Sequence, residues 1–193
     1  ETGTPAVNFA NVGSGTNTLR FDYLVTAIQN TSSLDIDELD LNGGTIKDLT
    51  NQFPAIISIP AGQNLADNNN IIIDNTNPTL DITTNITSPT NVNTPSFVIS
   101  VNEAGTLSTN IVQADTVANT ANVLNSDNAS GATLSLTAGN HTITFAQLKD
   151  ATYNNKTITS TDAAGNSVNA SLTNPFTIDT VNPTLTVDSH VSV

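Results

Sequence analysis

The chain has 193 residues, a formal net charge of −13, and no cysteine, methionine or tryptophan. Only 4 Lys and Arg residues stand against 17 Asp and Glu, so the phosphate backbone of a nucleic acid would be repelled. The absence of cysteine excludes disulfides, thiolate metal sites and cysteine nucleophiles. No apolar run reaches the roughly 18–20 residues that span a bilayer, and we expect no membrane insertion in this segment.

The polar surface has to be built mainly from uncharged residues, because hydrophobic residues make up 37% of the chain and charged residues only 11%. Thr suits a pleated sheet, whereas Asn and Ser suit turns. Short apolar runs alternate with turn residues, and no stretch has sustained helical periodicity. The sequence therefore predicts an all-β protein.

The first part of the chain is predicted to be a small β-module. We expect residues 1–3 to be an expression scar left after signal-peptide cleavage, and residues 4–76 to form the module. Its predicted strands cover residues 7–9, 18–25, 39–41 and 55–59. The module is short for an immunoglobulin-like sandwich of about 100 residues, so we expect it to be either incomplete or genuinely reduced.

An internal repeat marks the module boundaries. Residues 73–80, IDNTNPTL, return as residues 178–185, IDTVNPTL. The repeated aspartates, Asp74 and Asp179, are 105 residues apart, which is the length of one immunoglobulin-like sandwich and far longer than a solenoid repeat. We therefore expect a complete immunoglobulin-like module over 77–181 and the stub of a following module over 182–193.

The second module has the number of strands expected of one immunoglobulin-like sandwich. Tyr153 precedes the penultimate strand, where it is either a tyrosine corner that closes the sandwich or an ordinary edge aromatic. The predicted strands cover residues 79–83, 96–101, 106–112, 132–136, 141–145, 157–161 and 167–178.

Several motifs resemble one family. In the first module they are residues 18–25, TLRFDYLV, and residues 41–48, LNGGTIKD; in the second they are NEAG at 102–105, TDAAGN at 161–166 and FTID at 176–179. They resemble the tandem bacterial Ig-like domains of large surface adhesins. The resemblance implies an extracellular location on the cell surface and calcium-stiffened stalks whose partners are the neighbouring repeats.

Two features depart from the family pattern. Asn77-Pro78 and Asn182-Pro183 replace the usual Ala-Pro, and residues 48–52 lack the glycine of the usual Asp-Ala-Ala-Gly-Asn turn. The second departure puts a metal site at the outer end of the first module in doubt.

A calcium site is predicted where the second module begins. In an immunoglobulin-like topology the loops after the second and sixth strands share the N-terminal end, which places Glu103 near Asp162 and Asn166. Asp74 ends the preceding module, and Ca²⁺ takes oxygen ligands of these kinds. The alternative is that 162–166 is only a favourable turn. Asp179 is expected to serve a following module as Asp74 serves this one.

Other candidate features favour simpler interpretations. The acidic run 35–40 is a second cation site or, more simply, a solvated loop. Lys149 and Lys156 are candidates for an isopeptide crosslink but read more simply as surface lysines. Sequons that a glycosylating pathway could use occur at Asn30, Asn85, Asn128, Asn140, Asn155 and Asn169.

No catalytic constellation is visible in the sequence. His141 and His190 have no Ser or Asp arrangement around them, and no nucleophile elbow, zinc signature or phosphate loop occurs. We therefore expect no enzyme, but spacer repeats of a microbial adhesin that reaches host or neighbouring-cell surface molecules through other domains. The alternatives are a fragment of an S-layer subunit, or a module that itself binds a glycan or a host protein.

Overall fold

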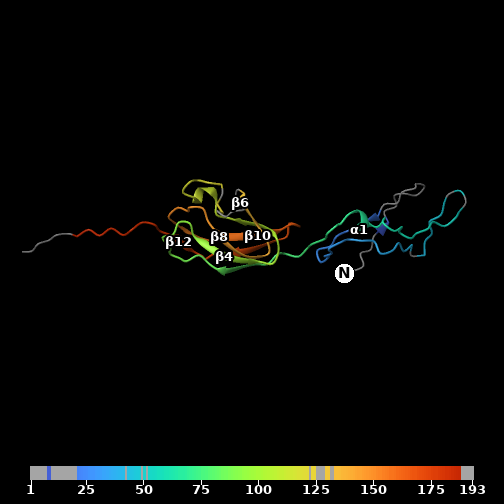
Figure 1. Cartoon of the computed structure of the whole chain (residues 1–193), viewed down its shortest axis with the longest axis horizontal. Coiled ribbons are helices and arrows are strands. Elements are labelled where there is room, and N and C mark those ends of the chain that lie inside the picture. The colour runs from blue at the N-terminus through green and yellow to red at the C-terminus, as the bar shows by residue number, and fades with distance from the viewer. Residues whose placement is uncertain are drawn as a thin grey trace, which may run out of the picture. The chain divides into compact units, whose positions relative to one another are not determined.

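A computed structural model describes residues 8–9, 21–41, 43–48, 50, 52–121, 123–124, 129–130 and 133–187. The chain divides into two compact units, Glu1–Thr76 and Asn77–Val193 (Figure 1). Both are all-β apart from two short helical turns. The predicted scar at 1–3, His190, most of the stub and the sequon at Asn128 lie outside the described residues.

The second unit is an all-β sandwich of antiparallel sheets. One sheet has the strand order β3-β4-β8, from Leu80–Thr84, Ser96–Val101 and Gly139–Thr144. The other has the order β11-β10-β5-β7-β6, from Ser167–Ser171, Thr157–Asp162, Gly105–Thr109, Thr133–Leu136 and Ala129–Ser130. A separate pair joins β9 (Ala151–Tyr153) to β12 (Phe176–Ile178), and the 3₁₀ turn η1 covers Gln113–Asp115.

Alternation along the strands creates the core of this sandwich. In β4 the side chains of Phe97, Ile99 and Val101 are buried, whereas Ser96 is exposed. The ring of Phe97 lies 5.3 Å from that of Phe145, measured between centroids. Burial of each large side chain contributes about 1.5–3 kcal/mol. The facing sheet adds the buried residues Leu107, Leu134, Leu136 and Ile158.

Tyr153 links three segments of the second unit. Its ring stacks on Phe176 with the centroids 4.8 Å apart, and its hydroxyl donates to the carbonyl oxygens of Lys149 (2.9 Å) and Asp115 (3.2 Å). The bond to a carbonyl four residues upstream is the contact that defines a tyrosine corner. Burial, and secondarily the charge of Asp115, raises the pKa of Tyr153 to about 12.

The last described strand of the second unit is joined by parallel pairing to the loop that follows its first strand. Thr90, in the loop after the first strand, forms a parallel bridge with Ile178 in the last strand. The Thr90 N–H donates to Thr177 O at 2.9 Å, and the Asp179 N–H donates to Thr90 O at 3.0 Å. These bonds hold β12 at the edge formed by the β3–β4 loop.

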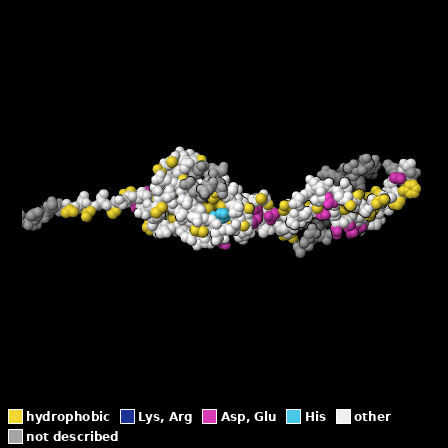
Figure 2. All heavy atoms as spheres, in the orientation of Figure 1, with side chains coloured by type: hydrophobic (Ala, Val, Ile, Leu, Met, Phe, Trp, Pro, Cys, Tyr) yellow, Lys and Arg dark blue, Asp and Glu magenta, His cyan; other side chains and the backbone are white. Residues whose placement is uncertain are grey.

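The first unit has little regular structure and a small core. β1 (Asn8–Phe9) pairs with β2 (Phe21–Asp22), and one helical turn, α1, covers Leu65–Asn68. Isolated bridges join Thr31 to Ile73 and Lys47 to Pro54. Within the described part of this unit, Ile73 is the single buried aliphatic side chain, and many hydrophobic side chains are visible on its surface (Figure 2).

The structure corrects several predicted strands. Residues 39–41 and 55–59 are not strands. The chain pairs with itself at the bridge between Lys47 and Pro54, and this pairing ends where the Ala55 N–H donates to Ile46 O. The predicted strand 167–178 is two strands, β11 and β12, and Pro175 between them has no N–H to offer a ladder. The predicted strand 106–112 ends at Thr109, and sequence reasoning missed β6, β9, α1 and η1. Neither described helix is long and apolar enough to cross a membrane.

Candidate metal centre

Asp162 is the centre of a tight turn between β10 and β11. Its Oδ1 accepts hydrogen bonds from the backbone N–H groups of Gly165 (2.7 Å) and Asn166 (2.9 Å). Its Oδ2 accepts one from Asn166 Nδ2 at 2.9 Å. Gly165 has φ +97°, a conformation that costs a glycine little. The turn therefore fixes the position of a buried carboxylate.

The same hydrogen bonds control the ionisation of Asp162. Burial alone would raise the pKa of this carboxyl group, but the bonds from Asn166, Gly165 and Ala164 outweigh burial and hold the pKa below its usual value. The side chain is therefore a carboxylate at neutral pH. A buried anion with lone pairs left on its oxygens is suited to receive a cation.

A close approach of two strands brings the β4–β5 loop beside this turn. Gly105 pairs with Asp162 across β5 and β10, and a Cβ atom built on Gly105 would lie 2.2 Å from the carbonyl oxygen of Thr161. Only glycine permits this spacing. The loop that ends at Gly105 carries Glu103, and its Asn102 accepts a hydrogen bond from the Thr79 N–H at 2.7 Å.

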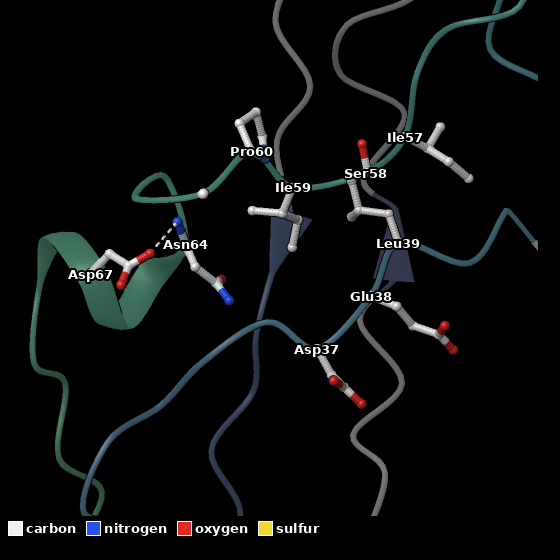
Figure 3. A pocket seen from close by; sticks show the side chains of 10 residues that line it. Asp37, Glu38, Leu39, Ile57, Ser58, Ile59, Pro60, Asn64 and Asp67 are labelled. Atoms are coloured by element: carbon white, nitrogen blue, oxygen red, sulfur yellow. Dashed lines mark hydrogen bonds between the residues drawn. The ribbon is translucent and has the colours of Figure 1, made fainter.

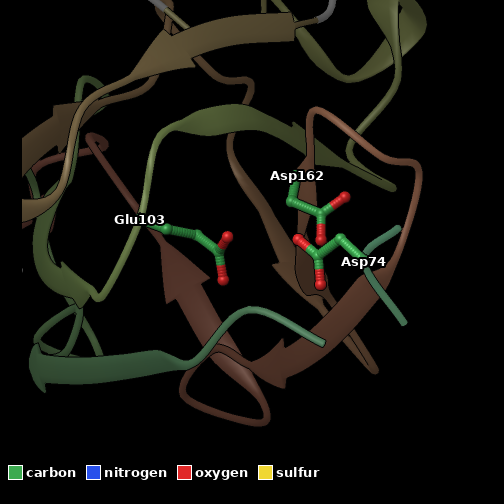
Figure 4. Close-up of side chains that lie close together, drawn as sticks. All are labelled: Asp74, Glu103 and Asp162. Carbon is green, nitrogen blue, oxygen red and sulfur yellow. The ribbon is translucent and has the colours of Figure 1, made fainter. Parts of the chain in front are cut away.

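Asp74 supplies the third carboxylate. Its Oδ1 accepts the N–H of Thr76 at 2.9 Å. One carboxylate oxygen from each of Asp74, Glu103 and Asp162 lies within 4.8 Å of the others (Figure 4). Three carboxylates this close repel one another unless a cation lies among them. These donors are hard oxygens with a charge of about −3, which fits Ca²⁺ better than a metal that needs Cys or His.

The remaining predicted ligands take other places. Asn166 donates its side-chain amide to Asp162 and so positions that carboxylate; its coordination of a metal stays a prediction. Asp179 is exposed, and its Oδ1 accepts the N–H of Val181 at 3.1 Å, the same local turn that Asp74 makes. Its role toward a following module also stays a prediction.

Other candidates from the sequence have structural partners. Asp35 Oδ1 accepts the N–H groups of Ile36 (2.9 Å) and Ala66 (3.1 Å). Lys149 Nζ donates to Ala114 O at 2.7 Å, and Lys156 forms a salt bridge of 3.2 Å with Asp115. His141 Nε2 lies 2.7 Å from Thr137 O. Sequence reasoning missed Asn102 and Asp115, whose partners are far away in the chain.

Comparison with known proteins adds no relative. No family model, no curated protein and no solved structure matches the chain. The proposals that follow depend on the residues and their geometry, and the likeness to adhesin repeats remains a resemblance of sequence motifs.

Proposed function

We propose that the chain is a pair of spacer repeats from the stalk of a large microbial surface adhesin, and that Ca²⁺ bound by Asp74, Glu103 and Asp162 stiffens the connection between repeats. The immunoglobulin-like identity of both modules and the extracellular location belong to the same proposal. The observation that carries it is the group of three carboxylates at the point where the chain enters the second unit.

The connecting chain is short enough to keep Asp74 near the other two ligands. Thr79 is bonded to Asn102, next to Glu103, and Asp74 lies five residues before Thr79. Even a fully extended chain of that length spans only about 17 Å. The cost of bringing Asp74 to the ion is therefore small, and an ion that holds all three side chains removes much of the freedom of the connection.

The repeat of the aspartate turn supports a stalk made of many modules. Asp74 and Asp179 each accept the N–H of the residue two positions later, so the repeated motifs IDNTNP and IDTVNP have the same local hydrogen bond. If a stalk consists of equivalent modules, the same turn should recur at each connection between one module and the next. Calcium bound at each turn would make every connection stiff in the same way.

The test measures the stiffness of the connection directly. The sequence has no cysteine, so Ser32→Cys and Ser135→Cys introduce two unique, exposed spin-label sites, one in each unit. Pulsed electron paramagnetic resonance then gives the distribution of distances between the labels, with excess Ca²⁺ and with a chelator. We expect calcium to narrow the distribution clearly.

A matched variant separates the site from general salt effects. Glu103→Gln with Asp162→Asn keeps the size of both side chains and removes two charges, and we expect its distance distribution to stay broad with calcium. The proposal of a calcium-stiffened connection would be overturned if the distance distributions of wild type and variant, each with calcium and with a chelator, all had the same width. The units would then be a flexible spacer.

A further inference from the structure

The first unit contains a groove that the calcium proposal does not use. It has a volume of about 570 Å³, within the size range of sites that bind small ligands or peptide segments. The segment Ile57–Pro60 forms one wall and the segment Asp37–Leu39 forms the other, with Asn64 and Asp67 of the α1 turn at one end (Figure 3). All of these residues belong to the first unit.

One wall of the groove has backbone groups with no partner among the residues that the structure describes. Pairing in the adjoining hairpin ends at Ala55. Beyond it, the N–H and C=O groups of residues 56–59 make no hydrogen bond within the described part of the chain. Unpaired backbone of this kind acts as a template on which another strand adds, a mode called β-augmentation.

The same wall is rich in β-branched apolar residues. Ile56 is 90% exposed and Ile57 is 38% exposed, and Ile59 and Pro60 continue the apolar lining opposite Leu39. No charged residue occurs between Asn51 and Ala66. Exposed edge strands usually carry a lysine or another charge that prevents pairing. Residues 56–59 do not form a strand in the structure, and they carry no such charge.

The charges around the groove select the partner. Asp37, Glu38 and Asp67 line it, and neither Asp37 nor Glu38 forms a salt bridge with any described residue. A second copy of this chain, with its net charge of −13, would bring more negative charge to an acidic groove. A segment with basic side chains would be attracted instead.

We propose that this groove binds an extended peptide segment in which aliphatic residues alternate with Lys or Arg. The peptide backbone pairs with residues 56–59, its aliphatic side chains lie against Ile57, Ile59 and Leu39, and its cations face Asp37 and Glu38. The first unit is then a docking site for a basic strand of another protein.

The test uses defined peptides with the full chain in the presence of a chelator, so that calcium plays no part. The probe is a fluorescein-labelled, capped TKVKVKT peptide, and fluorescence anisotropy measures its binding. The controls are TEVEVET, which reverses the charge, and a TKVKVKT peptide with alternate backbone nitrogens methylated, which keeps the charge and removes hydrogen-bond donors.

We expect saturable binding of TKVKVKT that weakens at least tenfold between low and high salt. The reversed-charge peptide and the methylated peptide should each bind at least tenfold more weakly. Asp37→Asn with Glu38→Gln should weaken TKVKVKT at least tenfold, because both side chains are on the surface and the change preserves their size. Circular dichroism of that variant checks that the fold is unchanged.

Three results would overturn the proposal. They are no binding of TKVKVKT at millimolar concentration, equal binding of the methylated peptide, and self-association of the chain that competes with the peptide. Equal binding of the methylated peptide would mean that only charge attracts it. Self-association, measured by sedimentation velocity, would mean that a second copy occupies the groove.

Discussion

Replacing Asp162 in two different ways separates its role in the turn from its role in metal binding. Asp162→Ala removes three accepted hydrogen bonds, from Gly165 N, Asn166 N and Asn166 Nδ2. Bonds to a charged group contribute about 1.5–3 kcal/mol each, but Gly165 is exposed and Asn166 half-buried, so water replaces part of the loss. We expect Asp162→Ala to lower the free energy of unfolding by about 2–4 kcal/mol without calcium.

Asp162→Asn keeps an oxygen acceptor for the two backbone N–H groups and removes only the charge. We expect it to cost about 1 kcal/mol without calcium, since one amide can rotate to restore the bond between the side chains at 162 and 166. In wild type, calcium at a hundredfold excess over Kd adds about 2.7 kcal/mol. For a unit of this size that gain raises Tm by more than about 10 °C, whereas Asp162→Asn should gain little.

Thermal unfolding followed by tyrosine fluorescence measures these shifts in the second unit when every variant also carries Tyr23→Phe, which leaves Tyr153 as the one tyrosine of the chain. The control is Asp150→Asn, the same chemical change at an exposed aspartate that bonds to Thr180. It should keep the full calcium response. If Asp162→Asn gains as much from calcium as wild type does, Asp162 is a turn former only, and the reasoning from the three carboxylates is refuted.

Four other measurements check the structural account of the second unit. Gly105→Ala should cost about 2–4 kcal/mol and reduce the calcium gain in thermal melts, because the new Cβ would lie 2.2 Å from Thr161 O; a wild-type melt would contradict the close strand spacing. Tyr153→Phe should cost about 1 kcal/mol in denaturant unfolding, since its hydroxyl bonds to two carbonyls. In an ultraviolet titration of the Tyr23→Phe variant, whose one tyrosine is Tyr153, ionisation should occur near pH 12; ionisation at pH 10 in the folded protein would contradict the burial of Tyr153. The stability that its raised pKa contributes is present below about pH 10 and is lost as pH rises toward 12. Asp162 has a lowered pKa, so its contribution to stability is present above about pH 4 and is lost as pH falls further; Asp162→Asn should show a smaller acid loss than wild type.

The sequence predicted the second unit well where side-chain alternation decides the structure. In residues 96–101 the large apolar residues Phe97, Ile99 and Val101 recur at every second position, their burial alternates with that of the residues between them, and β4 has the predicted bounds. Residues 157–161 also became a strand, extended only to Asp162. In both cases one face is buried, so local pattern and tertiary packing agree.

The predictions failed where the core does not cover the apolar residues. Residues 55–59 have high β-propensity, but no strand in the described part of the first unit pairs with them, and Ile56 stays exposed. Propensity alone does not make a strand without a partner. The short strands β6 and β9 were missed because their sequences show little alternation of polar and apolar residues. They are strands because they pair with β7 and β12.

The sequence proposed the residues of the candidate site but not what holds them in place. Motif and repeat placed Asp162, Glu103 and Asp74 together. The spacing between β5 and β10 at Gly105, and the bond from Thr79 to Asn102, depend on contacts between residues far apart in the chain. No local pattern in the sequence signals such contacts.

The parallel pairing of Thr90 with Ile178 has a consequence for a protein under tension. β12 is the last described strand of the second unit, so a pull on the chain that follows it acts along the Thr90–Thr177 and Asp179–Thr90 hydrogen bonds. In parallel pairing these bonds are sheared together and do not open one after another. Resistance to forced unfolding depends on the unfolding rate, and a load shared among several bonds slows that step. A module whose last strand is held in this way can carry mechanical load along a filament while its equilibrium stability remains ordinary.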